Sequence, residues 1–222
     1  MIQFSEIHSS YNISWGRRID PLFRILANQN YIDEFFENGN LFISSFENFK
    51  MYDDEMQGDI SEGQSLIGGF DENGNGHHVF YEGAMQAYIL CTTKNLSDEV
   101  IVDFNGVGAI KIVNSVLFAK EIARKLPFVN VGIEGSCIYV ESKVQHLEDE
   151  KNELFQKINF SNRDMMNETI TALSNGVEIF MKYKKYEHQN EHRLAWFSER
   201  KIKSGIVVHC PEAVQYCEKL MF

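Results

Sequence analysis

A Gln-x-Glu triplet lies in the most basic stretch of this sequence. Residues 181–203 contain seven lysines and arginines against three acids, although the whole chain has a formal net charge of −11. Gln189 and Glu191 are two positions apart, so in an extended segment both side chains would lie on the same face. The local excess of positive charge suits a pyrophosphate. We therefore expect a small anionic ligand here; an ordinary surface ion pair between Glu191 and Arg193 is the alternative.

A second group of residues fits a metal-dependent nuclease. Glu141 and Lys143 form an E-x-K pair at the end of an expected strand, where a carboxylate could bind Mg²⁺ and a lysine could orient the attacking water. Asp103 would be the partner acid. The motif is short and the acidic chain disfavours a nuclease, so a polar strand end is the simpler interpretation.

Two acidic patterns have ordinary structural explanations. Residues 71–82 fit the calcium-loop pattern that ends at Glu82, but two glycines stand where a helix should precede the loop, and a hairpin turn explains the same residues. Residues 47–62 form an acidic segment that is most simply a solvated face. A basic partner protein could bind that segment if the chain is an interaction or sensing protein without catalytic activity.

The order of several features resembles a widespread, largely uncharacterised bacterial domain family that also occurs in phage and mobile-element genes. Five features match in order. The first three are residues 15–17, residues 41–54 (at positions 41–46, 49, 53 and 54) and residues 88–93. The last two are residues 104–110 (at Phe104, Gly106 and Ile110) and residues 182–194 (at positions 182–186 and 191–194). The family's tryptophan-rich block after the cysteine strand is missing. The family's W-x-x-E-x-E-x-R element also differs here, because Tyr186 stands in place of its tryptophan.

Within this resemblance, the order of an arginine, a strand serine and Gln-x-Glu is similar to that of the ADP-ribosyltransferase fold. The similarity implies that Arg17 binds the phosphates of NAD and that Ser44 or Ser45 orients the glutamate and the nicotinamide ribose. It implies that Glu191 stabilises the oxocarbenium-like transition state and that Gln189 faces the acceptor. NAD would be the substrate, with no metal required. The implied function is an NAD-consuming transferase or NAD glycohydrolase that acts as a toxin or defence effector.

The elements that must position these residues mix helices and strands without a regular βαβ alternation. We expect helices over residues 21–38, 115–126 and 211–220, and mostly helix over 148–187. Strands are expected over 41–44, 79–81, 87–93, 108–113, 137–140, 193–197 and 205–210. The pattern predicts a single α+β domain over residues 1–222, with a central, mainly antiparallel sheet, whole or split, and helices outside it.

Composition excludes several classes of protein. With 44% hydrophobic and 13% aromatic residues the chain is too apolar to be disordered, and its acidity argues against broad nucleic-acid binding. No apolar run is long enough to span a membrane, and residues 1–10 do not resemble a signal peptide. The four cysteines have no zinc-ligand spacing, which favours free thiols in the cytoplasm.

Overall fold

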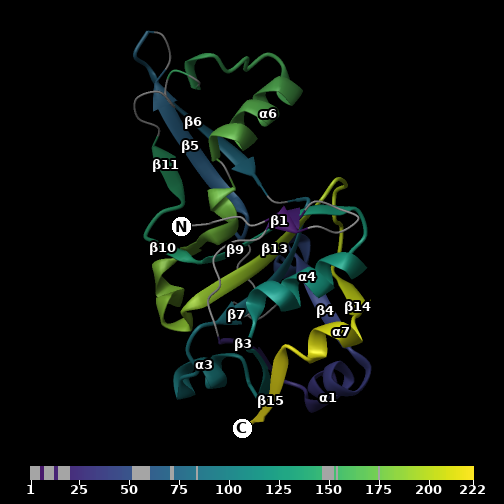
Figure 1. Ribbon diagram of the computed structural model, residues 1–222. Helices are drawn as coiled ribbons and strands as arrows, with labels where there is room; N and C mark the ends of the chain where they lie inside the picture. The colour runs from purple at the N-terminus through teal and green to yellow at the C-terminus, as the bar shows by residue number, and fades with distance from the viewer. Residues whose placement is uncertain are drawn as a thin grey trace.

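The structure is a computed structural model that describes residues 6–7, 13–14, 21–51, 61–70, 73–83, 85–146, 153, 155–174 and 176–222. It has an α+β fold built on a mainly antiparallel sheet (Figure 1). The eight strands of the main sheet are β3 (Leu22–Leu26), β4 (Asn40–Ser45), β7 (Ala87–Thr93), β8 (Gly108–Ile112), β9 (Val129–Ser136), β13 (Glu191–Ser198), β14 (Ile206–His209) and β15 (Cys217–Met221). The predicted fold class is therefore confirmed.

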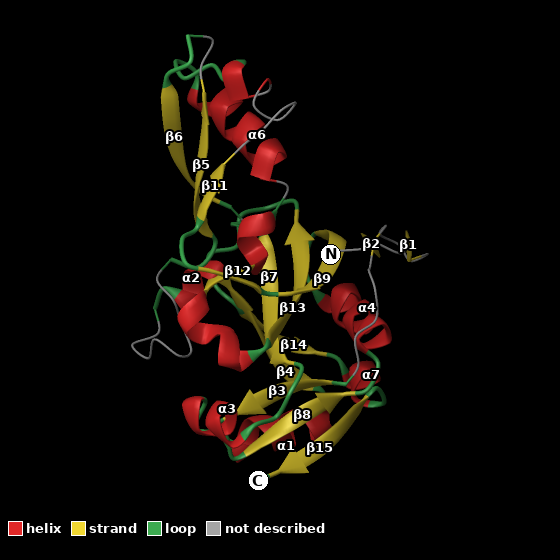
Figure 2. Cartoon of the chain, turned by 90° about the vertical axis from the view of Figure 1, so that its left-hand side faces the viewer, coloured by secondary structure: helices red, strands yellow, loops and turns green. Residues whose placement is uncertain are grey.

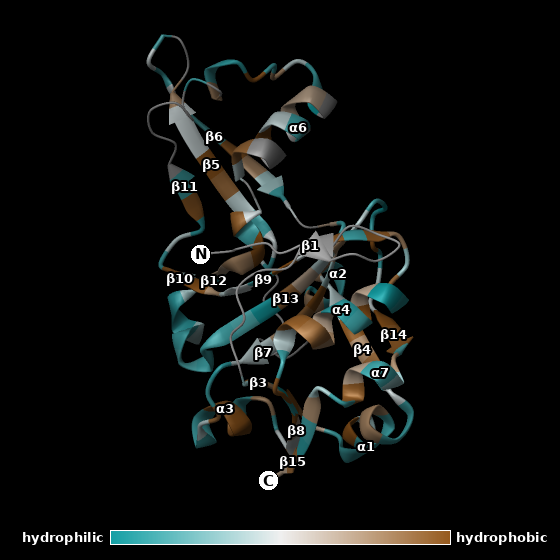
Figure 3. Cartoon of the chain, viewed as in Figure 1, coloured by the Kyte–Doolittle hydropathy of each residue, from teal (hydrophilic) through white to brown (hydrophobic). Residues whose placement is uncertain are grey.

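Helices flank this sheet, and two of them have well-formed ends. The flanking helices are α1 (Gln29–Asn38), α2 (Phe46–Phe49), α3 (Asp98–Asp103), α4 (Ser115–Lys125) and α7 (Pro211–Val214). The Asn114 side chain caps α4 by accepting from the Leu117 N–H. Helix α1 ends at Gly39, whose φ of 73° places it in the left-handed region that glycine adopts easily. Figure 3 shows hydrophilic and hydrophobic residues side by side on α4, as expected for a helix with one buried face.

A smaller unit, called here the arm, projects from one end of this body in both views (Figures 1 and 2). It consists of the hairpin β5 (Gln64–Phe70) and β6 (Gly76–Glu82), strand β11 (Val144–His146) parallel to β5, and helix α6 (Arg163–Ser174). Its own apolar cluster contains Ile67, Val79, Tyr81, Phe155, Ile158, Ile170 and Leu173.

Short elements complete the described chain. They are β1 (Glu6–Ile7) paired with β2 (Ile13–Ser14), β10 (Ile138–Val140) paired in parallel with β12 (Met181–Tyr183), and the 3-10 helices η1 (Val177–Phe180) and η2 (Lys184–Gln189). No described helix has the length and apolar character that crossing a membrane requires.

Three predicted helical regions need correction. Residues 21–38 begin with strand β3, because pairing with β8 overrides an apolar spacing that fits either element. Residues 211–220 contain only the short helix α7 before β15 extends the sheet beside β8. Residues 148–187 contain α6, but also β12 and 3-10 turns. Strand β9, which the sequence pattern missed, pairs along β13.

The main sheet is split where β7 meets its neighbours. Strand β13 pairs with the whole length of one edge of β7. On the other edge, β4 pairs with Tyr88 and Ile89, and β3 pairs only with Thr93. Residues 90–92 of β7 therefore have no partner strand on that edge among the described residues. The sheet opens there into a notch between β3 and β4.

Candidate ligand-binding site

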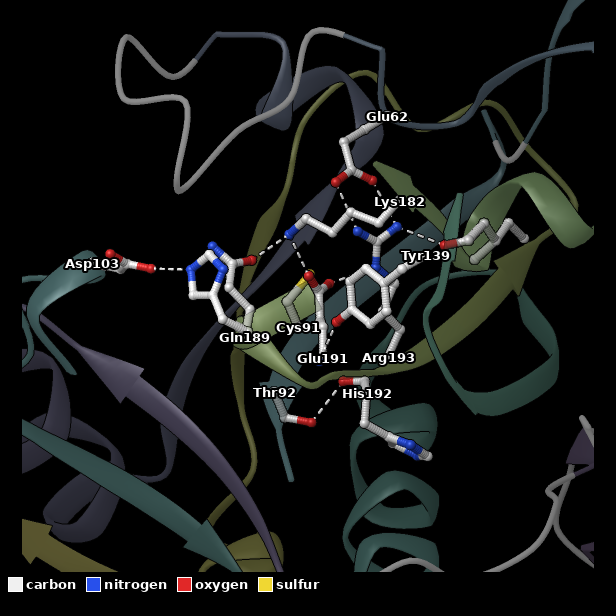
Figure 4. A network of polar contacts seen from close by, with 12 residues as sticks. Glu62, Cys91, Thr92, Asp103, Tyr139, Lys182, Gln189, Glu191, His192 and Arg193 are labelled. Atoms are coloured by element: carbon white, nitrogen blue, oxygen red, sulfur yellow. Dashed lines mark hydrogen bonds and ion pairs between the residues drawn. The ribbon is translucent and has the colours of Figure 1, made fainter. Parts of the chain in front are cut away.

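Strand β13 places Glu191 and Arg193 on one face of the sheet and His192 on the other. Glu191 pairs with Thr93 of β7, and Arg193 pairs with Cys91. Alternate residues of a strand face opposite sides, so both charged side chains point to the face of Cys91. His192 points away from them (Figure 4). The extended segment expected for Gln189 and Glu191 is not present, because Gln189 ends η2 and only Glu191 belongs to β13.

Arg193 is the centre of a buried polar network (Figure 4). Its Nε donates to Glu191 Oε1 at 2.6 Å, and its Nη2 donates to Glu62 Oε1 at 2.8 Å. Its Nη1 donates to the carbonyl oxygen of Ile179 at 2.6 Å. Arg193 is only 1% exposed, so these contacts are made almost without solvent. The ion pair of Arg193 with Glu191 is therefore a core feature and not the surface pair considered from the sequence.

Lys182 of β12 binds the other oxygen of Glu191. Its Nζ donates to Glu191 Oε2 at 2.5 Å and to Gln189 Oε1 at 2.6 Å. The ammonium also lies 4.9 Å from the centre of the Tyr186 ring. On the backbone side, the Glu191 N–H donates to the hydroxyl of Tyr139 at 2.7 Å. Each carboxylate oxygen of Glu191 thus has its own cation.

The charges of this network keep Glu191 ionised. Burial alone would raise its pKa, but Arg193 and Lys182 outweigh burial and hold the pKa of Glu191 well below its ordinary value. Burial would lower the pKa of Lys182, yet the nearby carboxylates of Glu191 and Glu62 raise it. A group ionised at every working pH is a poor general acid or base but a good fixed charge.

The notch between β3 and β4 holds a cavity of about 640 Å³. Buried side chains from the network, Glu62, Lys182, Glu191 and Arg193, form its inner wall. Its outer end is more exposed and is formed by α1, β4 and β14. The other lining residues are Arg24, Ile25, Leu26, Ala27, Asn28, Tyr31, Glu34, Asn40, Leu41, Phe42, Phe49, Cys91, Phe104 and Val207. A second and much smaller pocket of about 30 Å³ lies beside the cavity. Gln189 lines only this smaller pocket, whereas Arg24 and Glu191 line both.

Arg24 differs from the other cations of the cavity wall. It is half-buried on β3, and its one described contact is a hydrogen bond from Nη1 to the carbonyl oxygen of Cys91 at 3.2 Å. None of the described carboxylates forms an ion pair with it. A guanidinium with unused donors beside a cavity is suited to a carboxylate or phosphate ligand.

Cys91 lines the same cavity but is not an activated nucleophile. Burial raises the pKa of its thiol, and the nearby charge of Glu191 raises it further. Burial likewise raises the pKa of the Cys137 thiol. All four cysteines are free thiols. Their neutral form suits packing better than covalent chemistry.

The structure brings together only part of the predicted NAD site. Gln189 and Glu191 share Lys182, but Gln189 is 1% exposed and does not face open solvent. Ser44 is buried opposite Ile89, four residues along β7 from the partner of Glu191, and its hydroxyl has no hydrogen-bond partner among the described residues. Arg17 lies outside the described residues.

Neither candidate serine reaches the cavity wall. The Ser45 hydroxyl caps α2 and donates to Asn48 Oδ1 at 2.9 Å. Ser44 does not belong to the residues that line the cavity. The structure therefore gives Ser45 a capping role at α2 and leaves Ser44 inside the sheet.

Sequence reasoning missed Arg24, Lys182 and Glu62 as site residues. A sequence signal existed for Arg24, because it is a lone charge in the apolar run of residues 22–26. Glu62 carried no such signal, since it pairs with a residue 131 positions away. Its burial also removes the last acid of the segment 47–62 from a surface that could meet a basic partner. Residues 52–60 of that segment lie outside the described residues.

The residues of the nuclease hypothesis have separate partners. Glu141 is exposed and pairs with Lys184 at 3.1 Å. Lys143 is buried and donates to the carbonyl oxygen of Ser61 at 2.9 Å. Asp103 binds His188 at 2.5 Å. No described contact joins these three side chains.

The described residues of the calcium-like pattern belong to the arm's hairpin. Phe70 pairs with Gly76 next to the turn, whereas Glu82 pairs with Gln64 at the opposite end of the hairpin. Lys50 binds the Glu82 carboxylate at 2.8 Å. Within the described ranges, no three His, Cys, Asp or Glu side chains gather as a metal site would need.

Comparisons with protein-family models, curated proteins and solved structures find no match to this chain.

Proposed function

We propose that this chain binds a small anionic ligand with an aromatic part in the cavity between β3 and β4, and that NAD is the first candidate. The observation that carries the proposal is Arg24, a half-buried guanidinium that faces the cavity without an ion-pair partner among the described residues. Holding a cation in such a place costs desolvation, which an anionic ligand would offset.

The charge of the inner wall supports an anion. Lys182 and Arg193 of this wall and Arg24 on β3 supply three positive charges, and Glu62 and Glu191 supply two negative charges. Four of these five groups already compensate one another inside the buried network. Arg24 is the fifth, and its fork of N–H donors matches a phosphate or pyrophosphate oxygen pair.

The size and the walls of the cavity support a ligand with a ring. A volume of about 640 Å³ lies in the range of roughly 300–1,000 Å³ that small-molecule pockets occupy. Tyr31, Phe42, Phe49 and Phe104 all line it. Aromatic side chains stack on the faces of bases and of nicotinamide, so they could hold the ring while Arg24 holds the phosphates.

NAD cleavage is the second step of the proposal. In this reaction the bond between nicotinamide and the ribose C1′ breaks, nicotinamide leaves with the electron pair, and water or an acceptor adds to C1′ while losing a proton. Glu191 would supply a permanent negative charge to the oxocarbenium-like transition state. Its low pKa supports this electrostatic role and argues against proton transfer by the same group.

Isothermal titration calorimetry with NAD, ADP-ribose and inorganic pyrophosphate tests the binding step. We expect NAD and ADP-ribose to bind more tightly than pyrophosphate. Arg24→Gln should weaken NAD binding at least about tenfold, the value of one charge-assisted hydrogen bond. Arg124→Gln is the matched control, because Arg124 lies on the outer side of α4 and pairs with Glu121. Absence of nucleotide binding, or binding indifferent to Arg24→Gln, would refute the proposal.

Release of free nicotinamide from NAD tests the cleavage step. The wild-type protein should release it, and Glu191→Gln should abolish release while circular dichroism confirms that the variant is folded. If the wild-type protein binds NAD but releases no nicotinamide with water or with protein acceptors, the cleavage step is wrong and the chain is an NAD-binding protein. Activity retained in Glu191→Gln would remove that residue from the reaction.

A further inference from the structure

Glu34 is a second polar group of the same cavity and lies at its exposed end. It belongs to α1, and both Glu34 and Asn40 line the cavity. Arg24 is half-buried on β3, whereas Glu34 is exposed to solvent. The cavity therefore has a cation on one wall and a carboxylate at its mouth.

The Glu34 carboxylate is held in place through one of its oxygens. Oε2 accepts from Asn38 Nδ2 at 3.2 Å and from Asn40 Nδ2 at 2.8 Å. Asn40 is itself fixed, because its Oδ1 lies 3.1 Å from Nδ1 of His209, the residue that pairs with Asn40 across β4 and β14. Two neighbouring elements thus orient this exposed side chain, and an ordinary surface glutamate would lack such support.

The second carboxylate oxygen remains available. Oε1 of Glu34 has no partner among the described residues, and a carboxylate can only accept hydrogen bonds. A ligand group at this place must therefore be a donor. A further phosphate would be repelled by the negative charge, so the ligand's phosphates should lie toward Arg24 and its donors toward Glu34.

We infer that Glu34 binds the adjacent hydroxyl groups of a ribose, so that the cavity selects nucleotides that carry a free 2′,3′-diol. This inference rests on the proposed function and specifies the ligand class of the same site. An acidic side chain that accepts from ribose hydroxyls is a general solution for nucleotide recognition. The pair of Arg24 and Glu34 gives the ligand one orientation, with its phosphates inward and its sugar hydroxyls at the mouth.

Binding of ADP and 2′,3′-dideoxy-ADP to the wild-type protein and two variants tests the inference by calorimetry. The wild-type protein should prefer ADP by about tenfold, equivalent to the loss of about 1.4 kcal/mol of hydrogen bonding. Glu34→Gln should reduce that preference to about twofold and leave the affinity for the dideoxy compound unchanged. Glu37→Gln is the matched control, because Glu37 is exposed on the same helix but does not line the cavity.

The outcomes separate this inference from the proposed function. If the wild-type protein binds both compounds equally, or if Glu34→Gln weakens both equally, Glu34 does not recognise the hydroxyls, although the cavity still binds nucleotides through Arg24. If neither compound nor NAD binds to the folded wild-type protein, the proposed function fails and the inference fails with it. A preference for ADP that Glu37→Gln removes as well would also overturn the assignment to Glu34.

Discussion

Arg193 and Glu191 show how a single strand can bury charge inside a sheet. Both residues are at most 5% exposed. Besides their mutual bond, Arg193 binds Glu62 and the carbonyl oxygen of Ile179, and the Glu191 carboxylate binds Lys182. Removing water from two ions is costly, and their attraction offsets that cost only when every donor and acceptor is satisfied. Lys182 and Glu62 supply the remaining charges of the network, and Glu62 Oε2 contacts Arg193 Nη1 as an ion pair at 2.7 Å. Losing one member should therefore cost more than losing a surface pair.

The pH dependence of stability tests this view of Glu191. Its folded pKa lies below the ordinary value of 4.5, so the stabilisation is complete above about pH 5 and is lost as the pH falls through the folded pKa. At pH 7, Glu191→Gln should lower the free energy of unfolding by about 3–5 kcal/mol, as expected for a broken buried pair. Below pH 4 the difference from the wild-type protein should shrink, because the carboxylate takes up a proton in the unfolded chain while it stays ionised in the folded protein.

Urea unfolding at pH 7 and pH 3.5 measures this difference. Glu212→Gln is the control, because Glu212 also has a lowered pKa but lies on the surface, where it pairs with Lys125. This substitution should change stability little at either pH. A difference between the wild-type protein and Glu191→Gln that stays constant with pH would contradict the assigned ionisation.

The sequence could indicate this site only where its partners are close in the chain. Gln189 and Glu191 were identified by a local triplet, and Lys182 lies nine residues before Glu191. Glu62 and Arg24 reach the site from distant elements, through a sheet whose strand order follows from long-range pairing. A single sequence does not encode which strands pair, so charge and spacing could not place these two residues.

At the scale of elements, secondary structure was predictable where local signals and tertiary packing agree. The helix expected over residues 115–126 corresponds to α4, and the strand expected over residues 87–93 corresponds to β7. Prediction failed for β3 and β15, which lie on either side of β8. Their residues have weak local preferences, and pairing with β8 decides their conformation.

The C-terminal end of α1 offers a test of how two elements pack. Gly39 has a φ of 73°, and an added Cβ would lie 2.6 Å from Cα of Pro211 at the start of α7. Gly39→Ala should therefore combine the cost of the left-handed backbone with a clash and lower stability by about 2–4 kcal/mol. Gly74→Ala is the matched control, because Gly74 has a similar φ of 80° with no atom near the added Cβ. It should cost about 1 kcal/mol.

Thermal and urea unfolding of the two glycine variants measure these costs. The difference between them isolates the contact of α1 with α7 from the backbone effect that both share. Equal losses would show that α7 moves aside to admit the methyl group. Such an outcome would mean that the close approach does not fix the position of α1 beside the cavity.

At the scale of the whole molecule, the arm and the body have separate apolar clusters. The arm's cluster contains seven buried residues, and the central strands β7 and β13 belong to the body. A polar contact joins the two parts, because the Tyr81 hydroxyl donates to Oε2 of Glu178 in η1 at 3.2 Å. Within the arm, the same hydroxyl accepts from Gln145 Nε2 of β11 at 2.8 Å. A small cluster attached in this way should open at a lower free energy than the body.

Hydrogen exchange under increasing urea distinguishes the two parts. Amides of β5 and β6 should exchange through partial opening, because β6 is an edge strand of a three-stranded sheet. Strand β13 is paired on both edges and β7 along the whole of one edge, so their amides should exchange only through global unfolding. Tyr81→Phe should lower protection in the arm by about 1–3 kcal/mol and leave β13 unchanged. Tyr216→Phe, in the body, is the control. Equal protection of β6 and β13 with the same urea dependence would show instead that arm and body unfold as one cooperative unit, and the nucleotide cavity would then depend on the arm's stability as well.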